Sequence, residues 1–462
     1  MATNHEAFQR AVRHHQAGQL AAAEQGYRQI LATEPGHAGA LHLLGVLAFQ
    51  LNRFDAAFDC ISRAIAIDPR QATFHCNLGE VYRAQGKVEL AQACYETALR
   101  LDPNLAAAHN NLGLALQTQV AFSAAAAHFQ EAIRIQANYV DAHYNLSRVL
   151  LLQGDYERGW QEYGWRLRMS GHPHQGFAPP HWDGTPLDSG TLFVYAEQGL
   201  GDTLQFIRYV PLARERTPNV VVQVAPKLIP LLTQSGFTGL LPEGEPLPQY
   251  AAQCSLLSLP GLLHSDATTI PAQVPYLHAN PELIASWRAA LSGVTGLKVG
   301  IAWQGNRAFY SDRFRSIPLA EFSPIAAVPG IRLISLQKTD GVDQMDALAD
   351  RFDFVKLGTE LDTAHGAFMD TAALMKNLDL VITSDTSIAH LAGGLGVPVW
   401  VALSVAPDWR FLLERVDSPW YPTMRLFRQT RFNQWSDVFE RIAAALADFN
   451  HDHSRKPIGN IP

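Results

Sequence analysis

"LVITSDTSIAHLAGGLGVPVWV", residues 380–401, indicates the fold of the carboxyl-terminal half of this chain. An apolar run breaks off into four small polar residues at 384–387, His390 follows, and a second apolar run covers 397–401. This order predicts a buried strand, a polar turn, a helix and another strand, as in a parallel α/β sheet. Such sheets bind ligands at the carboxyl ends of their strands, which is where the polar turn would lie.

The same alternation of strands and helices extends beyond this stretch in two series. Apolar runs lie at 191–196, 219–225 and 253–259 before a helix at 281–291, and then at 297–303, 331–337, 352–358, 379–384 and 397–403. Two series predict two doubly wound lobes. We place these lobes at 190–294 and 295–446, followed by a tail at 447–462.

A 34-residue period occupies the first third of the chain. The period is kept by Pro35, Pro69 and Pro103, by Gly45, Gly79 and Gly113, and by bulky residues at Ile61, Tyr95 and Phe129. Small residues at helix crossings with this period are the tetratricopeptide pattern. We therefore expect an all-α superhelix over 1–168 and a linker at 169–189.

One column of the repeats carries asparagine. Asn77, Asn111 and Asn145 are each 34 residues apart on the first helix of successive repeats. An amide there can donate to a peptide carbonyl and accept from an N–H, which would hold an extended chain. The alternative is that asparagine is merely common before Leu-Gly in these repeats. The neighbouring histidine column (75, 109, 143) is too widely spaced for one metal ion, so we interpret it as packing.

Composition excludes several classes of protein. The chain has 462 residues, a net charge of -7 and four cysteines without C-x-x-C spacing. The charge argues against a general nucleic-acid binder, which needs a basic surface. The polar amino terminus and the absence of a run of about 18 apolar residues predict no signal peptide and no membrane span. We expect a soluble cytoplasmic protein with reduced thiols.

The loop "AEQGLGDTLQF" (196–206) follows the first expected strand of the first lobe. Gly199 and Gly201 permit a tight turn, and Asp202 falls at the start of the next helix. Asp202 is either a functional carboxylate or a helix cap. The glycine pattern is incomplete for dinucleotide binding, and no acidic partner for a ribose follows, so we reject an NAD site.

The loop "AWQGNRAFYSDRFRSIPLAEF" (302–322) carries candidates for anion binding. Arginine forks match phosphate geometry, and a helix expected near Pro318 would offer free N–H groups. The alternative is a solvated charged loop. Two further loops, "SLQK" (335–338) and "APDWRFLLERVDSPWYPTMRLFRQ" (406–429), also follow expected strands. The aromatic residues Trp409, Trp420 and Tyr421 of the second either stack on a sugar or base or lie buried between lobes.

Several common enzyme motifs are absent from the sequence. H-E-x-x-H, G-x-S-x-G and G-x-x-x-x-G-K-[ST] do not occur, which removes the usual protease, esterase and NTPase interpretations. No D-x-D pair is present, so we expect no carboxylate site for a metal–diphosphate complex and no metal cofactor.

Two of these loops resemble a known family. "GLGDTLQFIRYVPL" (199–212) resembles the amino-terminal loop of the family 9, heptosyltransferase-like glycosyltransferases, and "SDTSIAHLAGGLGVPVWV" (384–401) resembles their D-[TS]-G-x-x-H-L-A donor motif. Joined to tetratricopeptide repeats, they resemble bacterial repeat–glycosyltransferase fusions. The architecture is also similar to that of O-GlcNAc transferase, whose repeats present asparagines to the acceptor polypeptide.

The resemblance implies a multidomain chain: an all-α tetratricopeptide superhelix followed by an α/β GT-B fold with two Rossmann-like lobes. It places a general base at Asp202 and donor contacts at Asp385, Thr386 and His390. The expected donor set is Gly305, Asn306, Arg313, Arg315, Ser316, Gln337, Lys338, Ser384, Asp385, Thr386, Ser387 and His390. The residues expected to face the cleft are Gln198, Gly199, Gly201, Gln205, Asp408 and Trp409. Ser387 departs from the family, which has glycine there.

The expected function is transfer of a sugar from a nucleotide-sugar to an acceptor, with a protein acceptor recruited by the repeats. Deprotonation of the acceptor and stabilisation of the departing diphosphate require no metal. Two alternatives remain open at this point. One is a repeat-based interaction scaffold whose α/β part has lost catalysis, and the other is a transferase acting on a lipopolysaccharide-type saccharide.

Overall fold

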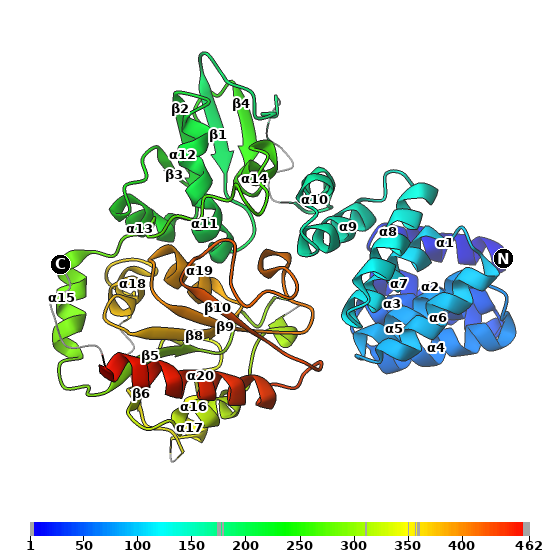
Figure 1. Ribbon diagram of the computed structural model, residues 1–462. Coiled ribbons are helices and arrows are strands. Elements are labelled where there is room, and N and C mark those ends of the chain that lie inside the picture. Colours follow the sequence, from blue (N-terminus) through cyan, green and yellow to red (C-terminus); the bar gives the residue numbers. More distant parts are fainter. Residues whose placement is uncertain are drawn as a thin grey trace. The chain divides into compact units, whose positions relative to one another are not determined.

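The computed structural model describes residues 4–172, 177, 180–309, 312–349, 351–355, 357 and 361–455. The chain divides into two compact units, one made of Met1–Leu150 with Glu162–Ser170 and the other of Leu151–Gln161 with Gly171–Pro462. Figure 1 shows helices alone in the first unit and two sheets with their helices in the second. Within the described ranges, every helix is too short or too polar to cross a bilayer.

The first unit is an array of antiparallel helical pairs. Its helices, with the two that continue into the second unit, are α1 Asn4–Gln16, α2 Leu20–Thr33, α3 Ala38–Gln50, α4 Phe54–Ile67, α5 Ala72–Ala84, α6 Val88–Leu101, α7 Ala106–Thr118, α8 Phe122–Ile135, α9 Val140–Leu152 and α10 Tyr156–Tyr163, followed by a 3₁₀ helix at Gly164–Arg168. The repeated glycines lie where paired helices cross. A Cβ on Gly45 would lie 2.6 Å from Ile61, and one on Gly113 would lie 2.6 Å from Phe129. Both large side chains are fully buried, so the 34-residue period is a packing period.

The histidine column also serves the array. The Nε2 atoms of His75, His109 and His143 lie 2.9, 3.1 and 3.0 Å from the backbone oxygens of residues 69, 103 and 137. Each imidazole therefore ties a helix to the linker that precedes it.

The described part of the second unit contains two parallel sheets. Their strands are β1 Thr191–Tyr195, β2 Asn219–Val224, β3 Leu240–Pro242, β4 Ala252–Ser255, β5 Leu297–Ala302, β6 Ile331–Ser335, β7 Phe354–Val355, β8 Leu380–Ser384, β9 Val399–Leu403 and β10 Met424–Arg428. The four-stranded sheet has the order β3-β2-β1-β4, and the six-stranded sheet has the order β10-β9-β8-β5-β6-β7. β3 was not expected, because its three residues lie in a stretch rich in glycine and proline. β10 was not expected either, because it falls in the stretch 406–429 that we interpreted as a loop.

The order of the six-stranded sheet decides where a ligand would lie. Strand order reverses at β5, which pairs in parallel with β6 on one side and with β8 on the other. Doubly wound sheets bind ligands at this point, outside the carboxyl ends of the two strands. Here those ends are Ala302 and Ser384.

The helices of the second unit differ from expectation at two places. These helices are α11 Leu200–Phe206, α12 Val210–Arg214, α13 Ile229–Gln234, α14 Leu259–Leu262, α15 Pro281–Ala290, α16 Ser323–Ala326, α17 Asp343–Ala347, α18 Met369–Met375, α19 Ser387–Gly394 and α20 Ser436–Arg455. We expected α15 to close the first lobe, but it packs against α18 of the second, where Trp287 Nε1 lies 3.1 Å from Asp370 Oδ1. We expected a tail from residue 447, but α20 continues to Arg455, because Leu446 and Phe449 pack onto the six-stranded sheet. The rest of the expected tail, 456–462, lies outside the described residues.

The coarse prediction of the fold is confirmed. An all-α repeat array is followed by parallel sheets and helices. Figure 1 also shows α11 and α19 side by side, and Gly201 of α11 approaches Ser387 and His390 of α19. The start of a helix that follows β1 therefore meets the start of a helix that follows β8.

Candidate functional site

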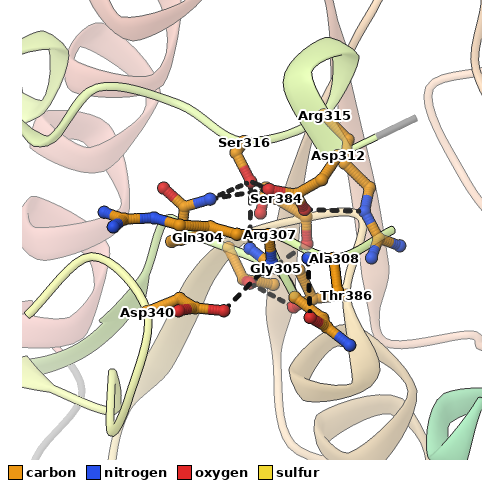
Figure 2. Close-up of polar contacts among 12 residues, drawn as sticks. Gln304, Gly305, Arg307, Ala308, Asp312, Arg315, Ser316, Asp340, Ser384 and Thr386 are labelled. Carbon is orange, nitrogen blue, oxygen red and sulfur yellow. Dashed lines mark hydrogen bonds and ion pairs between the residues drawn. The ribbon is translucent and has the colours of Figure 1, made fainter. Parts of the chain in front are cut away.

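The loop after β5 is organised around a buried carboxylate, Asp312 (Figure 2). Its Oδ2 accepts hydrogen bonds from Ser316 Oγ at 2.8 Å and from Gln304 Nε2 at 2.6 Å. Ser316 Oγ in turn accepts from the Gly305 N–H at 3.0 Å. A Cβ on Gly305 would collide with the Asp312 carboxylate, so glycine is required at this close approach. The loop is thus held in one shape by its own polar groups.

Of the two expected arginines, Arg315 lies in this cluster. Its Nε is 3.3 Å from Asp312 Oδ1, and its guanidinium stacks 4.7 Å from the Phe309 ring centre. Arg313 is exposed and stacks on its neighbour Phe314. Asn306 stabilises the turn by accepting the Ala308 N–H at 2.9 Å. The structure therefore favours Arg315 over Arg313 as the cation of the site.

Two expectations for this region were wrong. The helix near Pro318 is only a 3₁₀ turn at Leu319–Phe322 followed by the short α16, and the N–H of Leu319 is bonded to Gln344 Oε1 at 2.8 Å. It therefore offers no N-terminal anion site. Gln337 does not present its amide to a ligand either. The Oε1 atom accepts from the N–H groups of Trp303 and Gln304, and the Nε2 atom donates to the oxygens of Gln304 and Asp340.

Lys338 also has a partner within the fold. Its Nζ lies 3.4 Å from Asp362 Oδ2, and that carboxylate also accepts from the N–H and hydroxyl of Thr371. The side chain is half-exposed, so a ligand would have to compete with Asp362 for it.

The turn after β8 supplies hydroxyl groups beside the β5 loop (Figure 2). Ser384 is fully buried, and its Oγ has no hydrogen-bond partner among the described residues. Thr386 precedes α19, and its Oγ1 lies 3.3 Å from that of Thr383. Ser387 is the first residue of α19, so its helix directs N–H groups toward this turn.

Asp385 lies in the same turn and accepts no hydrogen bond from the described residues. Burial raises its pKa to about 7, and nearby Asp408 and Asp202 act in the same direction. Arg315 and Arg410 oppose the shift. The loops of both sheets therefore bring several charges into one electrostatic environment.

His390 is buried on the first turns of α19. Its Nδ1 lies 3.1 Å from the hydroxyl oxygen of Tyr421. Burial lowers its pKa to about 3, and Arg410 adds to that effect. The imidazole is therefore neutral at physiological pH and acts as a hydrogen-bonding group, not as a cation.

Asp202 uses both oxygens of its carboxylate. Oδ2 accepts the Gly199 N–H at 2.8 Å, so Asp202 caps α11 as one sequence interpretation predicts. Oδ1 forms an ion pair with Arg410 Nη2. Burial raises the pKa of Asp202, whereas Arg410 and the Gly199 N–H favour the ionised form. Gln198 precedes this turn with a left-handed φ of 63° and is exposed.

Arg410 is the functional candidate that sequence reasoning missed. Its side chain is 9% exposed, and its Nη1 lies 2.8 Å from Asp408 Oδ1. It joins the loop after β9 to Asp202 on α11. The stretch "DWRF" carries a local signal, because the arginine directly follows the expected cleft residues Asp408 and Trp409.

The aromatic residues near Arg410 are structural. Trp409 is 3% exposed, and Trp420 and Tyr421 are 1% exposed each. Trp409 meets Trp420 at a centroid distance of 6.0 Å and Trp160 at 5.3 Å. The interpretation that these rings stack on a sugar or base is wrong, because hydrophobic packing buries them.

The asparagine column joins successive repeats. The Nδ2 atoms of Asn77, Asn111 and Asn145 lie 2.7, 3.8 and 3.0 Å from His42 Nε2, Cys76 Sγ and Asn110 Oδ1, respectively, in the preceding repeat. Each side-chain amide therefore forms a hydrogen bond to the preceding repeat within the array. The Oδ1 atoms of Asn77 and Asn145 accept none from the described residues, so peptide binding through them stays a prediction.

These features define a helical-repeat protein with a parallel α/β region. Models of the TPR repeat match residues 45–86 and 79–120, and a model of the tetratricopeptide repeat matches residues 122–163. The predicted repeat array is confirmed, and tetratricopeptide arrays present extended surfaces to protein partners.

A bacterial relative covers more of the chain. Protein FlbA of Caulobacter vibrioides is 26% identical over 329 residues, which make up 65% of this chain and 54% of FlbA. The chain thus spans about half the length of this curated relative. Among solved structures, PilF of Pseudomonas aeruginosa is 22% identical over 36% of this chain and 77% of its own, with a TM-score of 0.34. A thermophilic TPR protein of Thermus thermophilus is 20% identical, and the match covers 37% of this chain and 93% of that protein, with a TM-score of 0.33.

Proposed function

We propose that this chain is a glycosyltransferase in which the two sheets form the lobes of a GT-B fold. The observation that carries the proposal is the convergence at the carboxyl ends of β5 and β8. Arg315, the Ser384 hydroxyl and the start of α19 lie in the loops at the point where strand order reverses in the sheet. A guanidinium, hydroxyls and helix N–H groups suit a diphosphate. The resemblance of residues 199–212 and 384–401 to family 9 enzymes supports the same conclusion.

The proposed reaction transfers the sugar in one displacement. The acceptor oxygen forms a bond to the anomeric carbon while the bond from that carbon to the diphosphate oxygen breaks. The hydroxyl proton passes to the Asp202 carboxylate, and the nucleoside diphosphate leaves with the electron pair of the broken bond. Arg315 and the N–H groups of α19 stabilise the charge that develops on the leaving group.

Asp202 must first be released from Arg410. Its Oδ1 is engaged by that guanidinium and its Oδ2 by the Gly199 N–H. A diphosphate is a competing bidentate partner for an arginine. We therefore infer that the donor draws Arg410 from the carboxylate to the phosphate, which frees the base only when substrate is bound.

The repeats would supply the acceptor. The repeat matches indicate a protein partner, and the asparagine column offers acceptor oxygens at Asn77 and Asn145. A protein substrate follows from this pairing of an interaction module with a transfer site. Replacing Asn77, Asn111 and Asn145 together by alanine should reduce transfer to a protein and spare transfer to a free saccharide.

The experiment that tests the base assignment is mass spectrometry of acceptors after incubation with nucleotide-sugars. Asp202→Asn should still bind the donor, because Arg410 is then free for the phosphate, and transfer at least about 100-fold more slowly, because general-base catalysis is lost. Transfer at the wild-type rate by this variant would refute the role of Asp202.

A second function is a protein-interaction scaffold whose α/β part is not catalytic. The repeat matches favour it, because tetratricopeptide arrays present extended binding surfaces to protein partners. The engaged state of Asp202 agrees with it as well. Calorimetry separates the two functions: a scaffold binds a protein partner and no nucleotide-sugar. Transfer to saccharides but to no protein, by wild type and by the variant lacking the three asparagines alike, would instead favour the lipopolysaccharide-type acceptor.

A further inference from the structure

Gln205 on α11 is a buried amide without a partner. It is fully buried, and neither Oε1 nor Nε2 has a hydrogen bond among the described residues. A buried polar group left unpaired destabilises the fold, so such groups usually serve a ligand, a water or catalysis. The amide is chemically unexplained by the fold alone.

The helical spacing shows where this amide lies. One turn earlier, a Cβ on Gly201 would lie 3.1 Å from His390 and 3.2 Å from Ser387. One turn later, Arg208 stacks 4.5 Å from the Tyr421 ring, which itself bonds to His390. Residues three and four apart share a helix face. Gln205 therefore lies in the layer between α11 and α19, three residues after Asp202.

A second unpaired atom lies on the same face. Arg208 is buried, and its Nη1 donates to the Trp420 oxygen at 2.6 Å while its Nη2 has no partner among the described residues. The face thus offers an amide donor, an amide acceptor and a guanidinium donor. Neighbouring hydroxyl groups of a sugar match this set, because each hydroxyl both donates and accepts.

We propose that Gln205 binds hydroxyl groups of the transferred sugar in the layer between α11 and α19. This assignment rests on the proposed glycosyltransferase function and adds the residue that recognises the sugar. The sugar would enter as the two helices separate, and it would lie beside Asp202, which precedes Gln205 by one turn. The Arg208 Nη2 atom supplies a further donor to the same ligand.

Calorimetry on the full chain tests the assignment. The probes are UDP-, GDP- and ADP-linked hexoses, each compared with its sugar-free nucleoside diphosphate. Gln205→Leu should weaken binding of the sugar-bearing ligand about tenfold or more and leave the nucleoside diphosphate within about twofold. Gln253→Leu is the matched control: Gln253 is also a buried glutamine with an unpaired Oε1, but it lies on β4 and bonds to His181. It should leave both affinities unchanged.

Thermal unfolding gives a second readout that needs no ligand. Because the amide is unpaired, Gln205→Leu should keep or raise the Tm of the free chain. A lower Tm would mean that an ordered water satisfies the amide, which overturns the proposal. Equal weakening of both ligands, or of neither, would also overturn it while the proposed function stood. Failure of every nucleotide-sugar to bind the wild type would refute the proposed function itself and the sugar site with it.

Discussion

The carboxyl group of Asp385 lies in an environment that favours its protonated form. Burial and the neighbouring Asp408 raise its pKa to about 7 against the opposing effect of Arg315 and Arg410. A raised pKa in the folded state adds stability at low pH, and this stability is lost as the pH rises through the folded pKa. Asp385 therefore destabilises the folded state more at pH 8, where its carboxyl group is ionised, than at pH 4, where it is protonated in the fold.

The upward shift of this pKa predicts how the stability of Asp385→Asn changes with pH. The variant should gain stability over wild type as the pH rises from 5 to 8, by about 1–2 kcal/mol after allowing for partial exposure. Thermal unfolding at the two pH values measures it, and the expected change in the Tm difference is a few degrees. An identical difference at both pH values would show that Asp385 does not titrate in this range.

Arg410 and Asp202 should be energetically coupled. Arg410→Gln leaves two carboxylates, Asp202 and Asp408, without their guanidinium, and breaking such a buried pair costs about 3–5 kcal/mol. In an Asp202→Asn background the same change should cost about 1–2 kcal/mol less. Urea unfolding of the four proteins gives the cycle, with Arg415→Gln as an exposed ion-pair control. Additive effects would contradict the pairing.

Sequence reasoning identified Asp202 and not its partner for a physical reason. The glycines and the helix start around Asp202 are local, so the pattern is readable within ten residues. Arg410 is 208 positions away, and only the packing of two loops brings it to Asp202. The same holds for Trp409, whose burial depends on Trp160 and Trp420, not on its neighbours in sequence.

At the scale of elements, the contact of α11 with α19 is the feature that joins the two sheets. Gly201 makes this contact possible, because a Cβ there would lie 3.1 Å from His390 and 3.2 Å from Ser387. Gly201→Ala should therefore destabilise the second unit by about 1–3 kcal/mol. Gly293→Ala, which meets no atom within 4 Å, should change stability by less than about 0.5 kcal/mol.

Chemical denaturation followed by tryptophan fluorescence checks this pair of variants. The second unit contains Trp409 and Trp420, so its unfolding has a strong signal. Equal stability of Gly201→Ala and Gly293→Ala would mean that α11 and α19 do not pack closely in solution.

Element types were predictable where the pattern was long or repeated. The 34-residue period predicted the helical pairs, and β-branched runs predicted β1, β5, β6, β8 and β9. Which elements pack against each other was less predictable than the type of each element. The stretch 281–291 predicts a helix, but not that this helix packs on α18 of the following lobe.

At the scale of the molecule, one segment of the last repeat belongs to the α/β unit, while Glu162–Ser170 stays with the repeats. We expected the array to extend to residue 168, yet Leu151–Gln161 groups with the second unit. Trp160 explains this division, because its Nε1 donates to the Ser265 oxygen at 2.8 Å and its ring meets Trp409. Trp409 adjoins Arg410, so the last repeat contributes to the packing that holds the Asp202–Arg410 pair.

The central claim is that a nucleotide-sugar binds where the loops after β5 and β8 meet. Arg315 lies in that cluster, whereas Arg313, two residues away, is exposed on Phe314. Arg313 can therefore serve as the control for Arg315, because both residues carry the same charge and lie in the same loop.

Calorimetry of the full chain with UDP-, GDP- and ADP-sugars tests this claim most directly. The account predicts that wild type binds at least one donor, that Arg315→Ala weakens this binding about tenfold or more, and that Arg313→Ala changes it less than about twofold. Binding of no donor by wild type, or equal weakening by the two variants, would contradict it.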